Sequence, residues 1–204
     1  MIEAAPPRRS GGFTRFRVVS IPMERDVLWA PWRIGYLVGS DRGDPAAGVR
    51  PERWRPAAAE DCFLCLAAAA APAHDRALGV LERTAHSCVV LNRYPYANGH
   101  LLVAPLDHRA DLAALPAASL LDLQQCLVRW SGVIGRTMQA QGFNVGLNVG
   151  AVAGAGLPGH LHWHLVPRWP GDVNFMASVA GIRVLPQALD ALWEQLAAAA
   201  GGPP

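Results

Sequence analysis

Three of the seven histidines stand at alternate positions in one short stretch, His160, His162 and His164. Bulky apolar residues alternate with them: Leu161, Trp163 and Leu165. In a β-strand, side chains two residues apart point to the same face, so the three imidazoles would share one face, with successive Cα atoms about 6.6 Å apart. Such a face can hold a nucleophile, a phosphate ligand and a metal ligand side by side, while the apolar residues pack into a core.

A histidine-rich, solvent-exposed edge strand is the alternative for this pattern. The glycines Gly154, Gly156 and Gly159 come directly before the histidines, within a loop that spans residues 150–159. Backbone N–H groups in a glycine-rich loop can approach phosphate oxygens closely. The combination therefore favours a site over a chance cluster.

A second group with chemical potential is the pair Cys62 and Cys65, separated by two residues. This spacing supplies two thiolates from one tight turn, as zinc sites require, but redox pairs have the same spacing. A disulfide framework is disfavoured in a chain of 204 residues that can build its own core. The remaining cysteines, Cys88 and Cys126, lie in apolar patterns and are predicted to be core residues.

The elements that would position these residues follow from the apolar pattern. Two apolar runs, 87–93 and 101–105, flank a connection with Pro95 and the Asn98-Gly99 pair, which predicts two antiparallel strands. After Pro116, apolar residues recur every three or four positions and predict a long amphipathic helix that ends before Gly142: Leu120, Leu123, Leu127, Trp130, Ile134 and Met138.

Two further strands are predicted at 144–149 and 160–168, and a C-terminal helix at about 186–199. The expected fold class is α+β, an antiparallel sheet with the long helix packed across one face. Ala67–Ala73 is rich in alanine, and a helix end or a spacer accounts for it.

The chain suits one domain with extensions, since 51% of its residues are hydrophobic and 17% are charged. We predict a disordered tail at residues 1–22, a Trp-rich segment and loop at 23–60, and the main domain at 61–199. Met23 resembles a natural start, so whether translation begins at Met1 or at Met23 stays open.

A net charge of +2 gives no basic face for a long nucleic acid, although small anionic substrates remain compatible. No apolar run reaches the ~18 residues of a membrane-spanning helix, and the N-terminus lacks a signal-peptide pattern. We therefore expect a soluble, cytoplasmic protein.

The alternation from His160 to Val166 resembles the motif of the histidine triad (HIT) superfamily, His-apolar-His-apolar-His-apolar-apolar. The stretch from Val90 to Pro105 is similar to the family segment that ends one strand, turns and opens the next. The resemblance implies a HIT-like fold. It also implies that His162 attacks an α-phosphorus to form a nucleotidyl-histidine, with one ring nitrogen held by a hydrogen bond to a backbone carbonyl.

The resemblance assigns roles to further residues. Asn92 would contact the ribose, although turn chemistry explains it equally well, and His100 would be a buried histidine that supports the triad. The phosphate would be held by His164, Asn148 and loop amides at Gly154 and Gly156. The loop after Asn148 is one residue longer than in human-type dinucleoside hydrolases, and Gly156 replaces a Gln or Ser of many relatives.

For the metal, zinc-bearing HIT proteins and the related galactose-1-phosphate uridylyltransferases imply a structural zinc with four protein ligands. These ligands would be Cys62, Cys65, His108 and His160.

The segment 28–33, the cysteine pair and the tail at 167–176 are similar to bacterial proteins of the diadenosine tetraphosphate (Ap4A) phosphorylase-like branch. This implies a nucleotidyl hydrolase or transferase acting on dinucleoside polyphosphates or related adenylylated compounds. The alternatives are a nucleoside phosphoramidase, a nucleotide-binding regulatory module with little turnover, and a zinc-stabilised scaffold. Many such proteins form two-fold dimers, so a homodimer is expected here.

Overall fold

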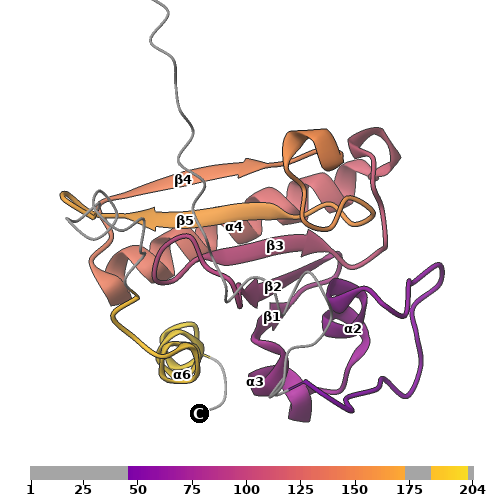
Figure 1. Ribbon diagram of the computed structural model, residues 1–204, viewed down its shortest axis with the longest axis horizontal. Helices are drawn as coiled ribbons and strands as arrows, with labels where there is room; N and C mark the ends of the chain where they lie inside the picture. The colour runs from indigo at the N-terminus through magenta and orange to yellow at the C-terminus, as the bar shows by residue number, and fades with distance from the viewer. Residues whose placement is uncertain (1–45, 173–184, 202–204) are drawn as a thin grey trace, which may run out of the picture.

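The computed structural model describes residues 46–172 and 185–201. The predicted tail 1–22, most of the Trp-rich segment and the boundary at Met23 lie outside the described residues. Five strands form one antiparallel sheet in the order β1-β2-β3-β5-β4, as Figure 1 shows. The strands are β1 (Val80–Arg83), β2 (Ser87–Leu91), β3 (Leu101–Pro105), β4 (Gly142–Leu147) and β5 (Trp163–Arg168).

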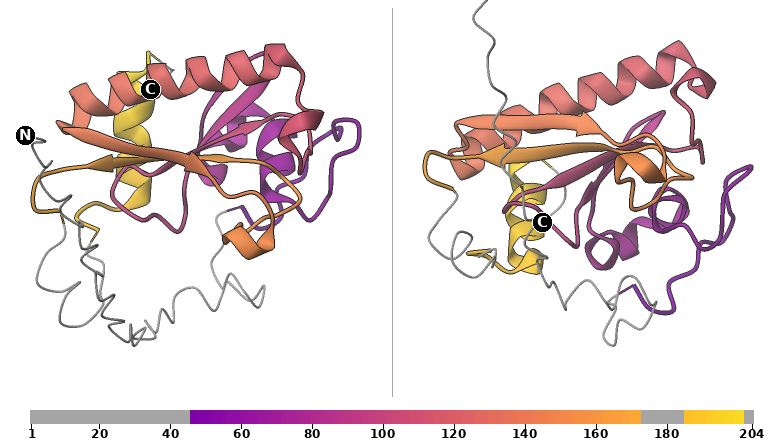
Figure 2. Two further views of the ribbon diagram at one scale, coloured as in Figure 1. Left: turned by 90° about the horizontal axis from the view of Figure 1, so that it is seen from above. Right: turned by 45° about the horizontal axis from the view of Figure 1, so that its top comes forward.

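The long helix α4 (Ala117–Met138) covers one face of this sheet, and Figure 2 shows it running along the strands. It begins directly after Pro116, whose fixed φ suits a helix start, and ends at Met138, followed by Gln139 in the left-handed conformation. Its apolar stripe is buried, including Leu123, Trp130 and Ile134. The predicted α+β fold with a helix across the sheet is confirmed.

The opposite face of the sheet is covered at β1 and β2 by α2 (Phe63–Ala69). Because β2 lies between two layers, alternate residues serve two cores: Val89 and Leu91 pack towards α4, whereas Cys88 and Val90 pack with α2. This explains why all five residues of β2 are buried. The prediction that Cys88 and Cys126 are core residues is confirmed, as both are almost completely buried.

A short helix and a C-terminal helix pack beside β1. The α3 turn (Asp75–Leu78) leads into β1, and α6 (Leu189–Ala199) packs on α4, α3 and β1. The C-terminal helix predicted at 186–199 is confirmed, with its start three residues later. Strand β1 and helix α2 were not predicted as elements. The alanine run 67–73 gives no periodic signal and was interpreted as a helix end or a spacer, and α2 does end within it, at Ala69.

Three predicted strands need correction. The strand predicted at 87–93 ends at Leu91, so Asn92 and Arg93 belong to the connection to β3. The structure ends β4 at Leu147, so Asn148 and Val149 lie in the following loop. It begins β5 at Trp163, so His160 and His162 lie on the approach to the strand rather than inside it. The reason is local: the N–H of Leu161 donates to the carbonyl of Arg109, outside the sheet, so strand pairing starts only after this contact. The predicted alternation is still observed, since Leu161, Trp163 and Leu165 pack into the core beneath α4.

Candidate functional site

The ring of His162 is held in one orientation by the backbone. Its Nδ1 lies 2.8 Å from the carbonyl oxygen of His160, and only a protonated Nδ1 can donate there. The proton of the neutral ring is therefore on Nδ1 and the lone pair on Nε2. The side chain is 7% exposed, so little water competes for that lone pair. This is the arrangement that a histidine nucleophile requires, and the backbone carbonyl is the acceptor expected from the sequence.

His164 lies next to His162, with ring centroids 5.1 Å apart and the rings nearly perpendicular. It projects from β5 on the face opposite α4, where its strand partners are Leu102 of β3 and Gly146 of β4. Burial, followed by the neighbouring charge of His162, lowers the pKa of His164 to about 4. His164 is thus neutral at physiological pH. Its Nε2 is buried and has no hydrogen-bond partner within the described residues.

His100 contacts His164 on the side of its Nδ1 atom. It is completely buried, and its Nε2 lies 3.0 Å from Nδ1 of His164. The ring of Tyr96 stacks on His100 at 4.9 Å and lies tilted 5.7 Å from His164. The structure thus brings His100, His162 and His164 together, as the sequence predicted.

A cluster of four ligand groups lies at the other side of the triad. The two Sγ atoms and the two ring nitrogens that can bind a metal all lie within 4.8 Å of one another. The closest separations are 3.3 Å from Cys62 Sγ to His160 Nδ1 and from Cys65 Sγ to His108 Nδ1. The predicted ligand set is therefore assembled: Cys62, Cys65, His108 and His160.

The geometry of this cluster fits a tetrahedral cation. Ligands at about 2.3 Å for sulfur and 2.0–2.1 Å for nitrogen would place sulfur and nitrogen about 3.6 Å apart, close to the 3.6 Å between Cys65 Sγ and His160 Nδ1. Burial raises the pKa of the Cys62 thiol to about 12, so this thiol ionises only beside a cation. Burial lowers the pKa of His160 to about 4, which keeps its ring neutral and able to bind metal.

The side chain and backbone of His160 connect the two halves of the site. Its Nδ1 faces the thiols, its Nε2–H donates to the carbonyl of Pro105 at 2.9 Å, and its own carbonyl accepts from His162. A metal ligand that donates its other ring N–H to a carbonyl is held in one tautomer and orientation. The ligand cluster and the nucleophile are therefore parts of one rigid unit.

Asn92 lies beside His100 at the end of β2, in the first turn of the connection to β3. Its Oδ1 accepts the backbone N–H of Tyr94 at 2.9 Å, and its Nδ2 lies 3.1 Å from Nδ1 of His100. Both polar atoms are thus engaged inside the protein, as in the turn chemistry considered for this residue.

The three remaining predicted residues lie in the loop between β4 and β5. Asn148 follows Leu147, the strand partner of Trp163, and its Nδ2 lies 3.5 Å from the carbonyl of Gly154. Gly154 and Gly156 are exposed in the same loop. The loop therefore leads directly into the segment that carries the histidines.

Two residues with a role in the site were missed. Tyr96 packs on His100 and His164, and only its aromatic type pointed to such a contact. Gly159 leaves room for a metal ligand, because a Cβ on it would lie 3.1 Å from Nε2 of His108. Its position directly before the first histidine was the available signal, but a close approach to His108 is visible only in three dimensions.

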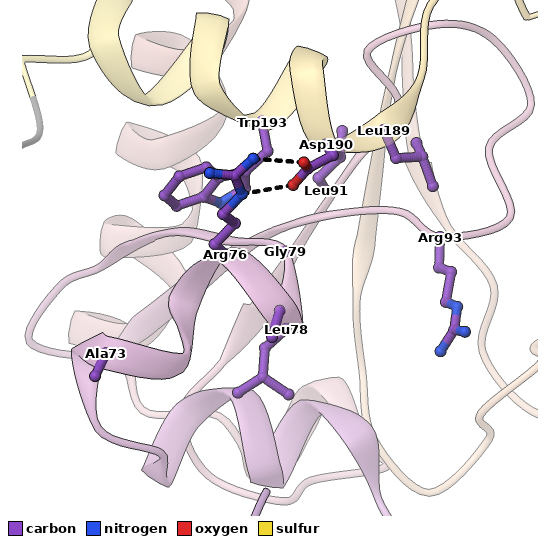
Figure 3. Close-up of a pocket in the computed structure, with 10 residues that line it drawn as sticks. Ala73, Arg76, Leu78, Gly79, Leu91, Arg93, Leu189, Asp190 and Trp193 are labelled. Carbon is purple, nitrogen blue, oxygen red and sulfur yellow. Dashed lines mark hydrogen bonds and ion pairs between the residues drawn. The ribbon is translucent and has the colours of Figure 1, made fainter. Parts of the chain in front are cut away.

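A cavity of about 600 Å³ lies elsewhere, between α3 and α6, and Figure 3 shows its lining. None of the seven histidines lines it. The guanidinium of Arg76 forms an ion pair with Asp190 across it, and the indole N–H of Trp193 donates to the carbonyl of Val80. These groups fasten α6 to α3 and β1. Among the helices described, none is long and apolar enough to cross a membrane.

Comparisons with known proteins agree with this geometry. A family model for the HIT domain matches residues 79–171. A protein of Mycobacterium tuberculosis named AP-4-A phosphorylase is 37% identical over 169 residues, which cover 79% of this chain and 77% of that protein. A Schizosaccharomyces pombe protein named bis(5'-nucleosyl)-tetraphosphatase (asymmetrical) is 33% identical over 95 residues, 47% of this chain and 52% of that protein.

Among solved structures, a Zn-bound histidine triad family protein from Mycobacterium smegmatis is 26% identical, with a TM-score of 0.51. The match covers 60% of this chain and 83% of that protein. The motif, the sheet that carries it and the similarity across more than three quarters of the chain lead to one conclusion. The chain belongs to the histidine triad (HIT) family.

Proposed function

We propose that this protein is a nucleotide-processing enzyme that cleaves dinucleoside polyphosphates such as Ap4A at an α-phosphorus. The observation that carries the proposal is the hydrogen bond from Nδ1 of His162 to the carbonyl of His160, which leaves Nε2 as a lone-pair nucleophile. The 37% identity to a protein named AP-4-A phosphorylase supports this substrate class.

In the proposed reaction, Nε2 of His162 attacks the α-phosphorus and forms a P–N bond. The bond between the α-phosphorus and the bridging oxygen breaks, and the remaining polyphosphate leaves. The buried Nε2 of His164 supports a role as a donor to a phosphate oxygen or to the leaving oxygen. Water or inorganic phosphate then attacks the nucleotidyl-histidine, breaks the P–N bond and frees His162.

Asn148 and the amides of Gly154 and Gly156 are proposed as further phosphate contacts, because they lie in the loop that joins β4 to the histidines. Asn92 is retained as a proposed ribose contact through the second lone pair of its Oδ1. These assignments rest on position in the fold and on the family resemblance.

We further propose that the cluster Cys62, Cys65, His108 and His160 holds zinc. Two thiolates and two imidazoles are a donor set that zinc prefers, and four protein ligands leave no position for a reacting water. The metal would therefore stabilise the fold around the triad rather than take part in the chemistry. The Zn-bound structure from Mycobacterium smegmatis supports this proposal.

A homodimer and a cytoplasmic location belong to the same proposal. Strand β4 is an edge of the sheet, and Val145 on it and Val128 on α4 are 53% and 74% exposed. An exposed apolar side chain on a strand that is at the edge of the sheet among the described residues, and a second one on α4, support association of two copies. Sedimentation of the purified protein would measure the oligomeric state.

The experiment for the function is incubation of purified protein with Ap4A, with and without inorganic phosphate, followed by identification of the products. ADP with ATP would indicate phosphorolysis, and AMP with ATP would indicate hydrolysis. Measurable binding without turnover would favour the regulatory module and contradict the proposal. A parallel assay with an AMP–amine conjugate tests the phosphoramidase alternative, in which the same nucleophile breaks a P–N bond.

A further inference from the structure

The orientation of the Asn92 side chain is set by a backbone donor. The N–H of Tyr94 lies 2.9 Å from the terminal amide of Asn92, and a backbone N–H can only donate. The amide oxygen must therefore face Tyr94. The amide nitrogen, a donor, must then face Nδ1 of His100 at 3.1 Å.

A second donor reaches the same ring nitrogen. The backbone N–H of Tyr96 lies 3.0 Å from Nδ1 of His100. With two N–H groups directed at it, Nδ1 can only accept, so the proton of the His100 ring is on Nε2. Since His100 is completely buried, bulk water cannot exchange this arrangement for another one.

The protonation of the His100 ring determines which ring nitrogen of His164 carries a proton. Nε2 of His100 lies 3.0 Å from Nδ1 of His164, so Nε2–H donates and Nδ1 of His164 accepts. The proton of the neutral His164 ring is then on Nε2, the buried atom without a partner among the described residues. A chain of hydrogen bonds thus runs in one direction, from the loop 92–96 to a free N–H beside His162.

We propose that Asn92 is a positioning residue of the triad: through Nδ1 of His100 it fixes His164 as the tautomer that presents Nε2–H to the substrate. The proposal adds a role to the ribose contact that the family resemblance assigns to Asn92. Its catalytic consequence, a donor ready for a phosphate or leaving oxygen, rests on the proposed function. The assignment of the tautomers of His100 and His164 does not depend on the proposed function.

The direct test is ¹⁵N NMR of the full chain, metal-loaded and labelled at histidine ring nitrogens, with His100→Gln and His164→Gln used to assign the signals. We expect both His100 and His164 to show an unprotonated Nδ1 and a protonated Nε2. A protonated Nδ1 on His164, or averaging of its two tautomers, would overturn the proposal.

Asn92→Asp separates the role of Asn92 from that of the Tyr96 amide. The carboxylate still accepts from Tyr94 but presents an acceptor to His100, so Nδ1 of His100 should become protonated in the same spectrum. If Nδ1 stays unprotonated, the Tyr96 amide alone fixes the ring and Asn92 has no positioning role.

Turnover provides a second readout with a matched control. Asn92→Ala should lower kcat for Ap4A about tenfold, the effect of one hydrogen bond, in addition to the rise in KM that loss of the proposed ribose contact causes. A rise in KM at unchanged kcat would instead identify a ribose contact only. Asn98→Ala, in the same loop but bonded to Gln187, should change neither constant. If wild type does not turn over Ap4A, the proposed function fails while the NMR result still decides the tautomers.

Discussion

At the scale of single residues, the proposed chemistry depends on the protonation of two imidazole rings, those of His162 and His164. The carbonyl of His160 keeps a proton on Nδ1 of His162, and burial keeps His164 neutral. The alternation of histidines and apolar residues was sufficient to predict which imidazoles share a face. The hydrogen-bond partners of Asn92 and His100 were not predictable, because they depend on the conformation of a turn that the sequence specifies only by type.

The neutral state of His164 predicts a pH dependence of stability. Its pKa of about 4 in the folded protein lies below the ordinary value of 6.5, so the unfolded chain binds an additional proton between these two values. The free energy of unfolding should therefore fall as the pH is lowered from about 6.5 to 4, by roughly 1–2 kcal/mol after allowance for the solvent-exposed part of the ring. Urea unfolding at several pH values measures this slope.

His164→Gln provides the comparison, since glutamine does not titrate in this range. In His164→Gln, the free energy of unfolding should fall less between pH 6.5 and 4 than in wild type, because only the contributions of the other titrating groups remain. Equal slopes in wild type and His164→Gln would show that His164 titrates normally in the folded protein.

Gly159 predicts a local effect on the metal ligands. Gly159→Ala places a Cβ 3.1 Å from Nε2 of His108, and a shift of His108 would disturb a ligand set that requires defined geometry. We expect zinc affinity to fall by about 10- to 100-fold, by analogy with loss of supporting contacts at other metal sites. Competition with a chromogenic chelator measures this, and Gly142→Ala, with its nearest atom 4.0 Å away, should leave affinity unchanged.

At the scale of elements, the ligand cluster joins three separate parts of the chain. It links the start of α2, the segment after β3 and the approach to β5 through Cys62, His108 and His160. The apolar pattern of the sequence predicted four of the strands and the long helix, because in each of them the pattern extends over many residues. It failed for α2, where the alanine run gives no periodic apolar face, and for the start of β5, where the contact of Leu161 with Arg109 lies outside the sheet.

The cluster predicts that metal and stability are lost together. Protein purified without added metal should hold about one zinc per chain, and Cys62→Ser with Cys65→Ser should lose it and unfold at lower temperature, because binding energy to thiolates contributes to folding. Elemental analysis and thermal unfolding provide the two readouts. Cys126→Ser, a buried cysteine outside the cluster, should keep its zinc; a metal-free wild type of full stability would contradict the prediction.

At the scale of the whole molecule, the sheet separates a layer that forms the main apolar core from a layer that carries the candidate site. The α4 side is a closed apolar core, and the other side carries α2, the ligand cluster and the histidines. The layer architecture was predictable from apolar periodicity. The order β1-β2-β3-β5-β4 was not, because pairing between strands far apart in sequence leaves no local signal.

The N-terminal region supplies a prediction about domain limits. Residues 1–22 contain few large apolar side chains and can bury too little surface to offset an ordering entropy of ~1–2 kcal/mol per residue. A chain that begins at Met23 should match the full-length protein in melting temperature and activity. A chain that begins after Arg33 loses Leu28, Trp29 and Trp32, each worth roughly 1.5–3 kcal/mol when buried, and should melt lower or aggregate. A lower melting temperature or activity of the chain that begins at Met23 would show that the folded domain starts before residue 23.

The central claim, that His162 forms a covalent intermediate, is tested most directly by trapping it. Rapid acid-free quenching of the protein with Ap4A labelled at the α-phosphate, followed by peptide mass spectrometry, should show AMP on the peptide that contains His162. His162→Ala should lack the adduct and lose several orders of magnitude in turnover, while its affinity for AMP and its melting temperature remain close to wild type. An active His162→Ala protein, or AMP attached to another residue, would contradict the account.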